Sequence, residues 1–224
     1  MVLNLLLGTC SARFILQHQL HMHCSASISA HLKEKIIHES LKLFSLKGFL
    51  STSLQDILEA AHTSKGGFYN HFQSKEDLFF QVLNEAKQIW REKNLEGLDQ
   101  IEDPIGKTIK LLENFRDRYL KDSDNFPGGC VFITLSVELN NQCPGLSKEI
   151  NKGFAGFKRM FKSFLDHADE RGDLKSVINT NAAIEILLNS VLGISVNYSL
   201  DKSDENLNNS IIALIDYVNN MRNL

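Results

Sequence analysis

The stretch His62–Phe79 reads HTSKGGFYNHFQSKEDLF and places two adjacent glycines, Gly66 and Gly67, inside a short helical segment. A glycine in a helix interior costs about 1 kcal/mol relative to alanine, so the pair requires a compensating use. Ser64 is a suitable N-cap for this helix, which we expect to cover residues 65–71. The stretch therefore predicts a short helix whose backbone is left bare on part of its surface.

The two faces of this helix differ in chemistry. At about 100° per residue, Phe68 and Phe72 lie together on the side that would pack into a core. The opposite side carries Gly66, Gly67 and Asn70, and it is flanked by Lys65, Tyr69 and His71. Such a helix can press its backbone against a DNA groove, with the N–H groups of its first turn directed at phosphate. A helical corner in an all-α enzyme, with ordinary polar surface residues, is the other interpretation of the pattern.

The segments around the glycine pair complete the outline of a helix-turn-helix. An amphipathic helix is expected over residues 31–47, and Gly48 would end it. Ser53 can cap a two-turn helix with Asp56 three residues on, a variant of the capping box, and Ser74 can cap the helix after the glycines. A helix, a two-turn helix, a tight turn and a short helix in this order are typical of a helix-turn-helix.

The segment FSLKGFLSTSLQDILEAAHTSKGGFYNHFQSKEDLF, within residues 31–79, resembles the N-terminal signature of the TetR family of ligand-responsive transcriptional regulators. The shared features are Gly-Phe, a Thr/Ser-led second helix ending in Ala-Ala, Ser-Lys-Gly, aromatic-Tyr, His-Phe and Ser-Lys-Glu-x-Leu. The resemblance implies DNA contacts, mostly to phosphates, from Thr52, Ser53, Ser64, Lys65, Gly66, Tyr69, His71 and Lys75. Gly67 and Asn70 depart from the family pattern, and we expect both to lie at the DNA and to alter operator preference.

Composition predicts an all-α fold of one or two domains. The 224 residues are 43% hydrophobic and 23% charged, with only three prolines and little β-branched alternation. We divide the chain into a disordered or mis-called leader (1–30), a three-helix helix-turn-helix head (31–77) and a helical ligand-binding and dimerisation bundle (78–224). The net charge is −3, yet residues 31–75 hold six lysines and four acidic residues. This weakly basic end fits a polyanionic partner.

The predicted bundle contains a phenylalanine stripe in its longest helix, with Phe157 and Phe161 at its centre. A stripe at this spacing is typical either of plain core or of the lining of a cavity for a small apolar ligand. With Phe115 and Tyr119 from the preceding amphipathic helix, these side chains are candidate contacts for a small-molecule inducer.

Two C-terminal helices are expected to form a dimer interface. Residues 182–198 are hydrophobic almost all round, too much so for a surface helix of a monomer, and residues 207–218 carry an apolar stripe. The resemblance implies that both helices pair with their symmetry mates in a homodimer. A twofold dimer would set two recognition helices about 34–36 Å apart, as a palindromic operator requires. A charge at Leu188 or Ile211 should then be buried unpaired.

Cys130 follows two glycines and opens an apolar helix, so the helix dipole should favour its thiolate. Around it, the sequence also resembles a TetR subgroup with a Gly-Cys-apolar helix start, some members of which sense electrophiles. Cys130 is therefore either a sensor or a small buried hydrophobe. A third interpretation, from another class of protein, is a small all-helical enzyme with Cys130 as nucleophile and a histidine as base, although His167 is the only histidine in the second half of the chain.

The N-terminal thirty residues predict neither export nor a metal site. The segment LNLLLGTC lacks a basic region and a long apolar run, and HQLHMHC (His18, His21, His23, Cys24) fits a disordered extension, or translation begins at Met22. The four cysteines (Cys10, Cys24, Cys130, Cys143) form no CxxC pair, so we expect free thiols, no metal and no cofactor.

The sequence thus predicts a cytoplasmic, homodimeric transcriptional regulator and not an enzyme. We expect it to repress by binding a palindromic operator in double-stranded DNA, and to be released by a small molecule or a thiol-reactive electrophile. No membrane partner is expected. The operator, the inducer and the direction of regulation are left open by the sequence.

Overall fold

The computed structural model describes residues 29–223, and these fold into helices joined by short connections. Within this range the only β pairing is an isolated antiparallel bridge between Leu174 and Arg222, so the predicted all-α fold is confirmed. The leader prediction for 1–30 falls almost wholly outside the described residues, as do His18, His21, His23, Cys10, Cys24 and the start at Met22. Residues 29 and 30 already belong to the first described helix, which runs over 29–47.

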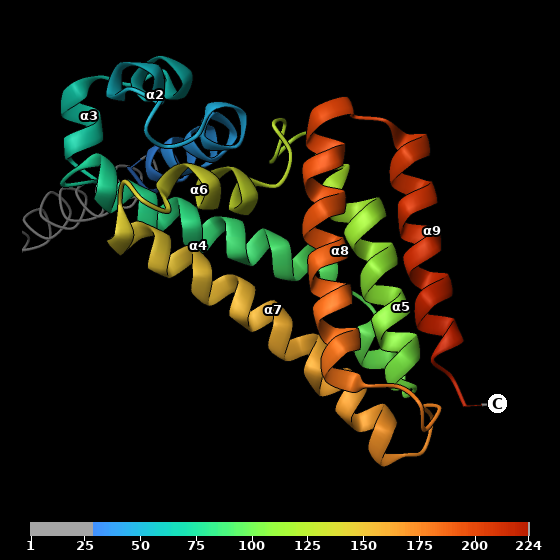
Figure 1. The fold of residues 1–224 in the computed structure, drawn as a ribbon. Coiled ribbons are helices and arrows are strands. Elements are labelled where there is room, and N and C mark those ends of the chain that lie inside the picture. Colours follow the sequence, from blue (N-terminus) through green and yellow to red (C-terminus); the bar gives the residue numbers. More distant parts are fainter. Residues whose placement is uncertain (1–28, 224) are drawn as a thin grey trace, which may run out of the picture.

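The head contains this helix, α2 (Leu54–Ala61) and α3 (Lys65–Tyr69), at one end of the molecule (Figure 1). The predicted caps form: the Ser53 side chain accepts from Asp56 N in a complete capping box, and the Ser64 side chain accepts from Gly67 N. Helix α3 ends at Tyr69, two residues earlier than expected, because His71 N turns back to the carbonyl of Phe68. The helix-turn-helix prediction is therefore confirmed, with a shorter α3.

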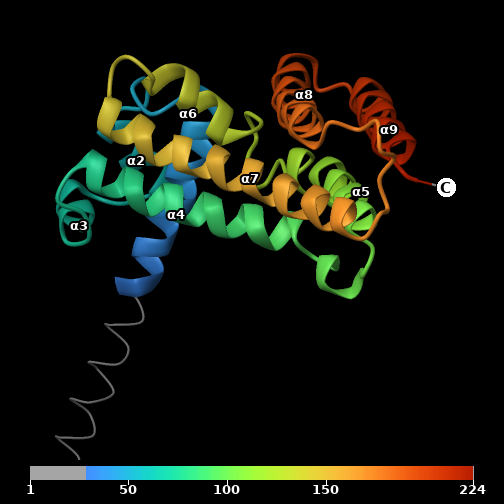
Figure 2. The ribbon, with the colours of Figure 1, turned by 60° about the horizontal axis from the view of Figure 1, so that its bottom comes forward.

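The remaining elements are α4 (Lys75–Asn94), η1 (Leu98–Gln100), α5 (Pro104–Asn114), a π-helical turn η2 (Phe115–Leu120), α6 (Val131–Leu139), α7 (Pro144–Glu170), α8 (Thr180–Asp201) and α9 (Asp204–Asn220). Helices α4 and α7 both leave the head and run into the rest of the molecule, and α7 continues further than α4 (Figures 1 and 2). Helix α8 packs against α7, and α9 packs against α5. The longest helix, α7, carries the predicted phenylalanine stripe.

We call the helical bundle that follows the head the body. Three aromatic rings connect the core of the head to the core of the body. Phe49, in the turn after the first helix, lies edge-on to Phe44 of that helix and to Phe79 of α4, with ring centroids 5.4 and 5.1 Å apart. The predicted boundary at residue 77 falls inside α4, which contributes to both cores. The division into two domains remains a proposal.

A second junction joins the head to α6 and to the loop before it. The Glu138 carboxylate accepts hydrogen bonds from the N–H groups of Phe49 (2.7 Å) and Leu50 (2.9 Å). On the other side of the junction, Gly128 N donates to Ser45 Oγ (3.2 Å), and the glycine lies directly on the main chain of the first helix. We call these contacts the head–body junction.

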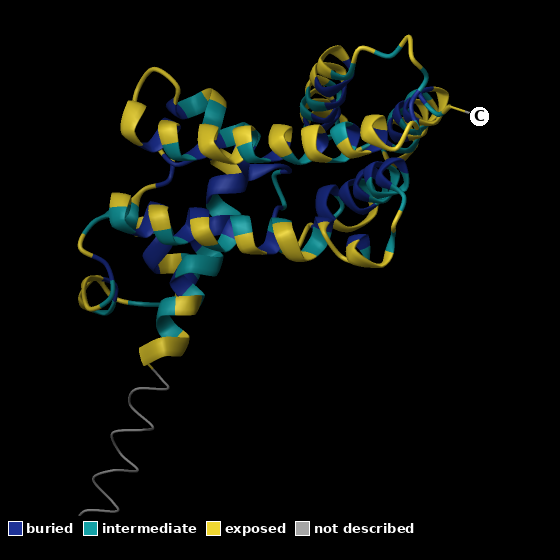
Figure 3. Cartoon of the chain, turned by 90° about the horizontal axis from the view of Figure 1, so that it is seen from below, coloured by how far each residue is buried: buried dark blue, intermediate teal, exposed yellow. Residues whose placement is uncertain are grey.

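The C-terminal helices expose apolar side chains that the chain does not cover. Ile186, Val196 and Leu200 of α8 are 44%, 40% and 81% exposed, and Ile212 of α9 is 49% exposed. Exposed residues continue along the outer side of this helix pair (Figure 3). By length and composition α8 would also qualify as a membrane span, with 44% of its apolar window buried in the protein. The uncovered surface fits the expectation of a partner copy.

Candidate nucleic-acid interface and ligand cavity

The two faces of α3 are arranged as predicted. Phe68 and Phe72 are fully buried, at 0% and 1% exposure, whereas Tyr69 on the other side is 50% exposed. Lys65, Gly66, Tyr69 and Asn70 are all exposed, and the capping Ser64 at the N-terminus is exposed too. His71 is half-buried in the turn after α3. The outer surface of α3 therefore presents a cation, a bare backbone segment, a phenol and an amide side by side.

The two glycines of α3 have different surroundings. A Cβ at Gly66 would meet nothing closer than Ser64 Oγ at 3.8 Å, so this position opens outward. At Gly67 a Cβ would run into the hydroxyl of Thr63, and the residue is half-buried near Leu32. Gly66 is thus the glycine that exposes backbone, whereas Gly67 faces Thr63 and Leu32 inside the head, an orientation that the sequence projection missed.

Thr52 was predicted to contact DNA, and the structure contradicts this. Its side chain is fully buried at 0% exposure, and its hydroxyl donates to the carbonyl of Gly48 at 2.6 Å. The residue closes the turn between the first helix and α2. Ser53 is exposed, but its hydroxyl is already bonded within the capping box, where it also donates to Asp56 at 2.7 Å.

Lys75 is also not placed as a free phosphate ligand. Its ammonium donates to the carbonyls of Phe49 and Thr52, both at 2.7 Å, and lies 4.3 Å from the centroid of the Phe49 ring. Burial lowers the pKa of this group from its ordinary value of 10.5. Lys75 therefore fixes the turn that carries α2, and its predicted DNA contact stays a prediction that would have to use the third donor of this half-buried ammonium.

Asp56 carries the strongest charge pairing of the head. Hydrogen bonds from Lys47 and Ser53 lower the pKa of its carboxyl from 3.8 to about 2. Its carboxylate lies 2.8 Å from Lys47 Nζ, so Lys47 is engaged as well. Helix α3 carries one cation of this surface, Lys65. Within residues 29–223 Lys65 makes no ion pair.

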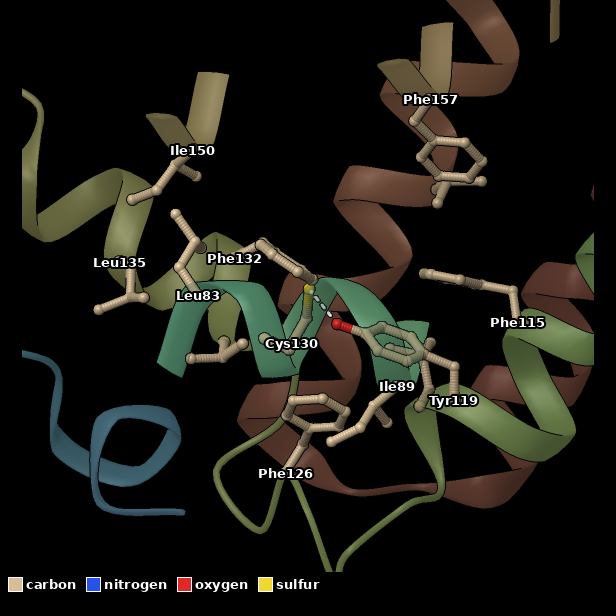
Figure 4. Close-up of a cluster of buried hydrophobic side chains, with 14 of the residues drawn as sticks. Leu83, Ile89, Phe115, Tyr119, Phe126, Cys130, Phe132, Leu135, Ile150 and Phe157 are labelled. Atoms are coloured by element: carbon tan, nitrogen blue, oxygen red, sulfur yellow. Dashed lines mark hydrogen bonds between the residues drawn. The ribbon is translucent and has the colours of Figure 1, made fainter. Parts of the chain in front are cut away.

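A cavity of about 590 Å³ lies in the body between α4 and α7. Three of the predicted ligand residues line it: Phe115, Cys130 and Phe157. The other two lie behind this lining. Phe161 is buried against Phe157, and Tyr119 is buried against Phe115, as Figure 4 shows. Of the five predicted ligand residues, the cysteine and two of the four aromatic residues thus line the cavity, and the remaining two belong to the core.

Several lining residues were missed by the sequence analysis. They are Lys87, Trp90, Arg91 and Leu95 from α4, Phe132 from α6, Ile150, Lys152, Gly153, Phe154, Gly156, Arg159 and Met160 from α7, and Val191, Leu192 and Ser195 from α8. The α4 residues lie near the charged C-terminal end of that helix, in the segment KQIWREKNL. The fact that they meet α7 is a property of the tertiary arrangement.

Cys130 is the N-cap residue of α6, at the helix start as expected, but the residue is buried at 6% exposure. Its sulfur lies 3.3 Å from the hydroxyl of Tyr119, the contact drawn in Figure 4. Burial raises the pKa of the Cys130 thiol and outweighs the hydrogen bonds that favour the thiolate. The predicted stabilisation of the thiolate by the helix dipole is therefore wrong, because the helix start lies in an apolar interior.

Two family models match the chain. One, described as "Bacterial regulatory proteins, tetR family", covers residues 36–82, and the other, described as "Tetracyclin repressor-like, C-terminal domain", covers residues 107–214. The first spans the caps and faces of the helix-turn-helix head, and the second spans the elements that line the cavity apart from α4.

Relatives and solved structures agree over most of the chain. The transcriptional repressor DhaR of Mycobacterium sp. strain GP1 is 24% identical over 83% of this chain and 91% of its own. A TetR transcriptional regulator from Chloroflexus aurantiacus has the same fold, with a TM-score of 0.80 at 21% identity over 88% of this chain and 99% of its own. AibR, solved with isovaleryl coenzyme A and operator DNA, gives a TM-score of 0.66 at 19% identity over 82% of this chain and 98% of its own. The chain belongs to the TetR family of bacterial transcriptional regulators.

Proposed function

We propose that the protein is a homodimeric repressor that binds a palindromic operator through α3 and releases it when a small molecule occupies the cavity. The observation that carries the DNA-binding role is the outer face of α3, where Lys65, Gly66 and Tyr69 are exposed beside a capped helix N-terminus. Such a face offers a cation and free N–H groups to phosphate and lets the backbone approach a groove. DhaR is named a repressor, and AibR was solved on its operator, which supports the assignment.

The test is selection of bound sequences from a random DNA library by the purified full chain. We expect a sequence with twofold symmetry and half-sites about one helical turn apart. Recovery of no enriched sequence, or of one without symmetry, would count against the dimeric repressor.

Replacing Lys65 with alanine should weaken operator binding about tenfold. The slope of the logarithm of the binding constant against the logarithm of salt concentration should also become shallower by about one unit per protomer. The residue is exposed and makes no contact with the buried Phe68 side of α3, so the melting temperature should not change. Lys162→Ala is the matched control, because this lysine lies on α7 and is paired with Asp166. Operator affinity measured at several salt concentrations decides the matter, and an unchanged slope would refute α3 docking through Lys65.

The short helix α6, like α4, connects the cavity to the head. Its first residues, Cys130 and Phe132, line the cavity, and Glu138 near its end holds the N–H groups of Phe49 and Leu50. A ligand that displaces the start of α6 therefore changes the head–body junction. We expect release to be a shift between two head positions, since a ligand can favour only the state that it binds better.

Cys130 remains a sensor candidate because its sulfur lines the cavity, but its burial and raised pKa predict slow reaction at neutral pH. Iodoacetamide should therefore label the half-buried Cys143 before Cys130 at pH 7, as followed by peptide mass spectrometry. Operator binding by the wild type and a Cys130→Ser variant, with and without alkylation, then separates the two modes of release. Rapid labelling of Cys130, with loss of DNA binding only in the wild type, would make the inducer an electrophile.

The enzyme alternative has no observation in its favour. Among residues 29–223, the Cys130 sulfur has the Tyr119 hydroxyl as its partner, and no histidine lines the cavity. A nucleophilic cysteine needs a base within hydrogen-bond reach, so a regulator is the function that this site supports. As a DNA-binding regulator, the protein would act in the cytoplasm.

A further inference from the structure

We propose that the cavity takes an amphipathic anion, with its apolar body on the aromatic floor and a carboxylate or phosphate at the mouth between α4 and α7. The inference rests on the proposed function, in which this cavity holds the inducer, and it adds the chemical class of that ligand.

Within the part of the chain that the structure describes, the lining of the cavity carries four cationic side chains and no acidic one. Lys87 and Arg91 stand one turn apart on α4, and Lys152 and Arg159 face them from α7. The chain as a whole has a net charge of −3, so this concentration of positive charge opposes the overall balance. Cations that surround the mouth of a partly apolar cavity raise the local concentration of anions and favour an anionic ligand.

Three of these cations are not committed to the protein itself. Lys152 is paired with Glu149, but Lys87, Arg91 and Arg159 have no carboxylate within 4.0 Å among residues 29–223. An anion can therefore bind them without first breaking an ion pair. Hydrogen bonds between such cations and a carboxylate or phosphate are about twice as strong as neutral ones.

Two glycines of α7 leave the mouth open. Gly153 and Gly156 both line the cavity, and a Cβ at Gly153 would meet nothing within 4 Å. At Gly156 the nearest group is the Arg159 guanidinium, 3.8 Å away, so this arginine lies along the gap. Glycine is unfavourable in a helix interior, and no packing contact requires it at position 153. A use that fits is room for a ligand to pass between the charged mouth and the floor.

The floor of the cavity is apolar and partly aromatic. Trp90 of α4 and Phe157 of α7 meet edge-on, with ring centroids 5.1 Å apart, and Phe115 and Phe132 continue this surface from η2 and α6. The volume of about 590 Å³ lies within the range of small-molecule sites. A fully polar anion would leave this floor unfilled, so the ligand must carry an apolar body.

Trp90 is the only tryptophan of the chain, so its fluorescence reports on the cavity directly. The probes are decanoate, decyl phosphate and decan-1-ol, which share one chain and differ in their head group, all used below micelle-forming concentrations. We expect at least one anion to bind about tenfold or more tightly than the alcohol. The stronger of the two anions identifies the head group. Decanol binding as tightly as both anions, or no response of Trp90 to any probe, overturns the proposal.

Neutral variants test the role of the cations. In the double variant Arg91→Gln, Arg159→Gln the preference for the anion should fall below about threefold, while decanol binding stays unchanged. Lys162→Gln, on α7 but outside the cavity, should keep the full preference. A double variant with the wild-type preference would refute the assignment of the mouth.

Two variants of α7 glycines test whether the open space at Gly153 admits the ligand. Gly153→Leu should reduce binding of all three probes at least tenfold without loss of fold, because leucine is a good helix former and the site is open. Gly145→Leu is also in α7 and equally open, but it lies outside the cavity, so it should bind like the wild type. If Gly153→Leu binds the probes as well as the wild type, the ligand does not pass beside position 153.

Operator binding without any probe is measured for every variant. It should be unchanged in all of them, since none lies in the head. If the wild type binds the operator but does not prefer an anion, only the proposed ligand class is refuted. If the wild type does not bind any operator, the proposed function is refuted.

Discussion

Alanine in place of Gly128 is expected to destabilise the protein by about 3 kcal/mol, because the new methyl group would overlap the main chain of the head. An ideal Cβ at this position would lie 2.7 Å from Leu46 Cα and would penetrate the carbonyl group of Ser45. These are main-chain atoms, so no side-chain rotation relieves the overlap. For a chain of this length the melting temperature should fall by roughly 6–12 °C, as measured by calorimetry.

Gly145→Ala is the control for this change, since a Cβ there meets nothing within 4 Å. It should melt at or slightly above the wild-type temperature. Because Gly128 belongs to the head–body junction, Gly128→Ala should also alter operator affinity and its response to a cavity ligand. A Gly128→Ala protein as stable as the wild type would mean that the loop does not rest on the head in solution.

Aspartate at position 212 is expected to convert the dimer into a monomer and to reduce operator affinity on the order of 100-fold or more. Ile212 is 49% exposed in the single chain, so the substitution leaves the monomer fold intact. In a dimer through α8 and α9 the carboxylate would be buried without a partner, at a cost of several kcal/mol. Sedimentation velocity gives the oligomeric state, and gel shift gives the operator affinity.

The control is Val177→Asp, at an apolar position that is 84% exposed and lies outside α8 and α9. It should remain a dimer. The charge predicted at Ile211 is a poorer test, because this residue is 0% exposed in the single chain and a carboxylate there would unfold α9. A stable monomer in the unmodified protein, or an unaltered dimer in Ile212→Asp, would refute the interface.

Local signals in the sequence predicted the head almost completely. Ser53, Ser64 and Ser74 cap their helices as expected, because an N-cap depends on residues two or three positions away. The burial of Phe68 and Phe72 follows from helical periodicity in the same way.

The sequence missed the contacts of side chains whose partners are distant in sequence or set by a turn. Thr52 and Lys75 were assigned to DNA by family resemblance, yet both hold the Gly48–Thr52 turn, whose path no helical projection contains. Glu138 was not identified at all, because its partners Phe49 and Leu50 lie 89 and 88 residues away.

The pKa shift of Cys130 could not be predicted from the sequence for a similar reason. The helix start was predicted correctly, but the sign of the pKa shift was not, since the dipole argument assumed access to solvent. The cavity mouth forms where α4 and α7 meet. The sequence pattern of the charged end of α4 does not indicate that α7 packs beside it. What could be predicted was therefore the set of elements and their faces, and what could not was which faces meet.

The π-helical turn after α5 stores one extra residue of chain beside the cavity. In a turn with i→i+5 hydrogen bonds, two consecutive side chains can face inward, and Tyr119 and Leu120 are both buried, at 1% and 3% exposure. An α-helical turn would rotate Leu120 about 100° further round the axis and direct it away from the core. Deleting one residue here, such as the exposed Asp117, would restore the regular helix and shift the following residues by one position. The distance between Tyr119 and Cys130 is thus set by chain length as well as by residue identity, and relatives that differ by one residue at this point should differ in cavity shape even where the lining residues are the same.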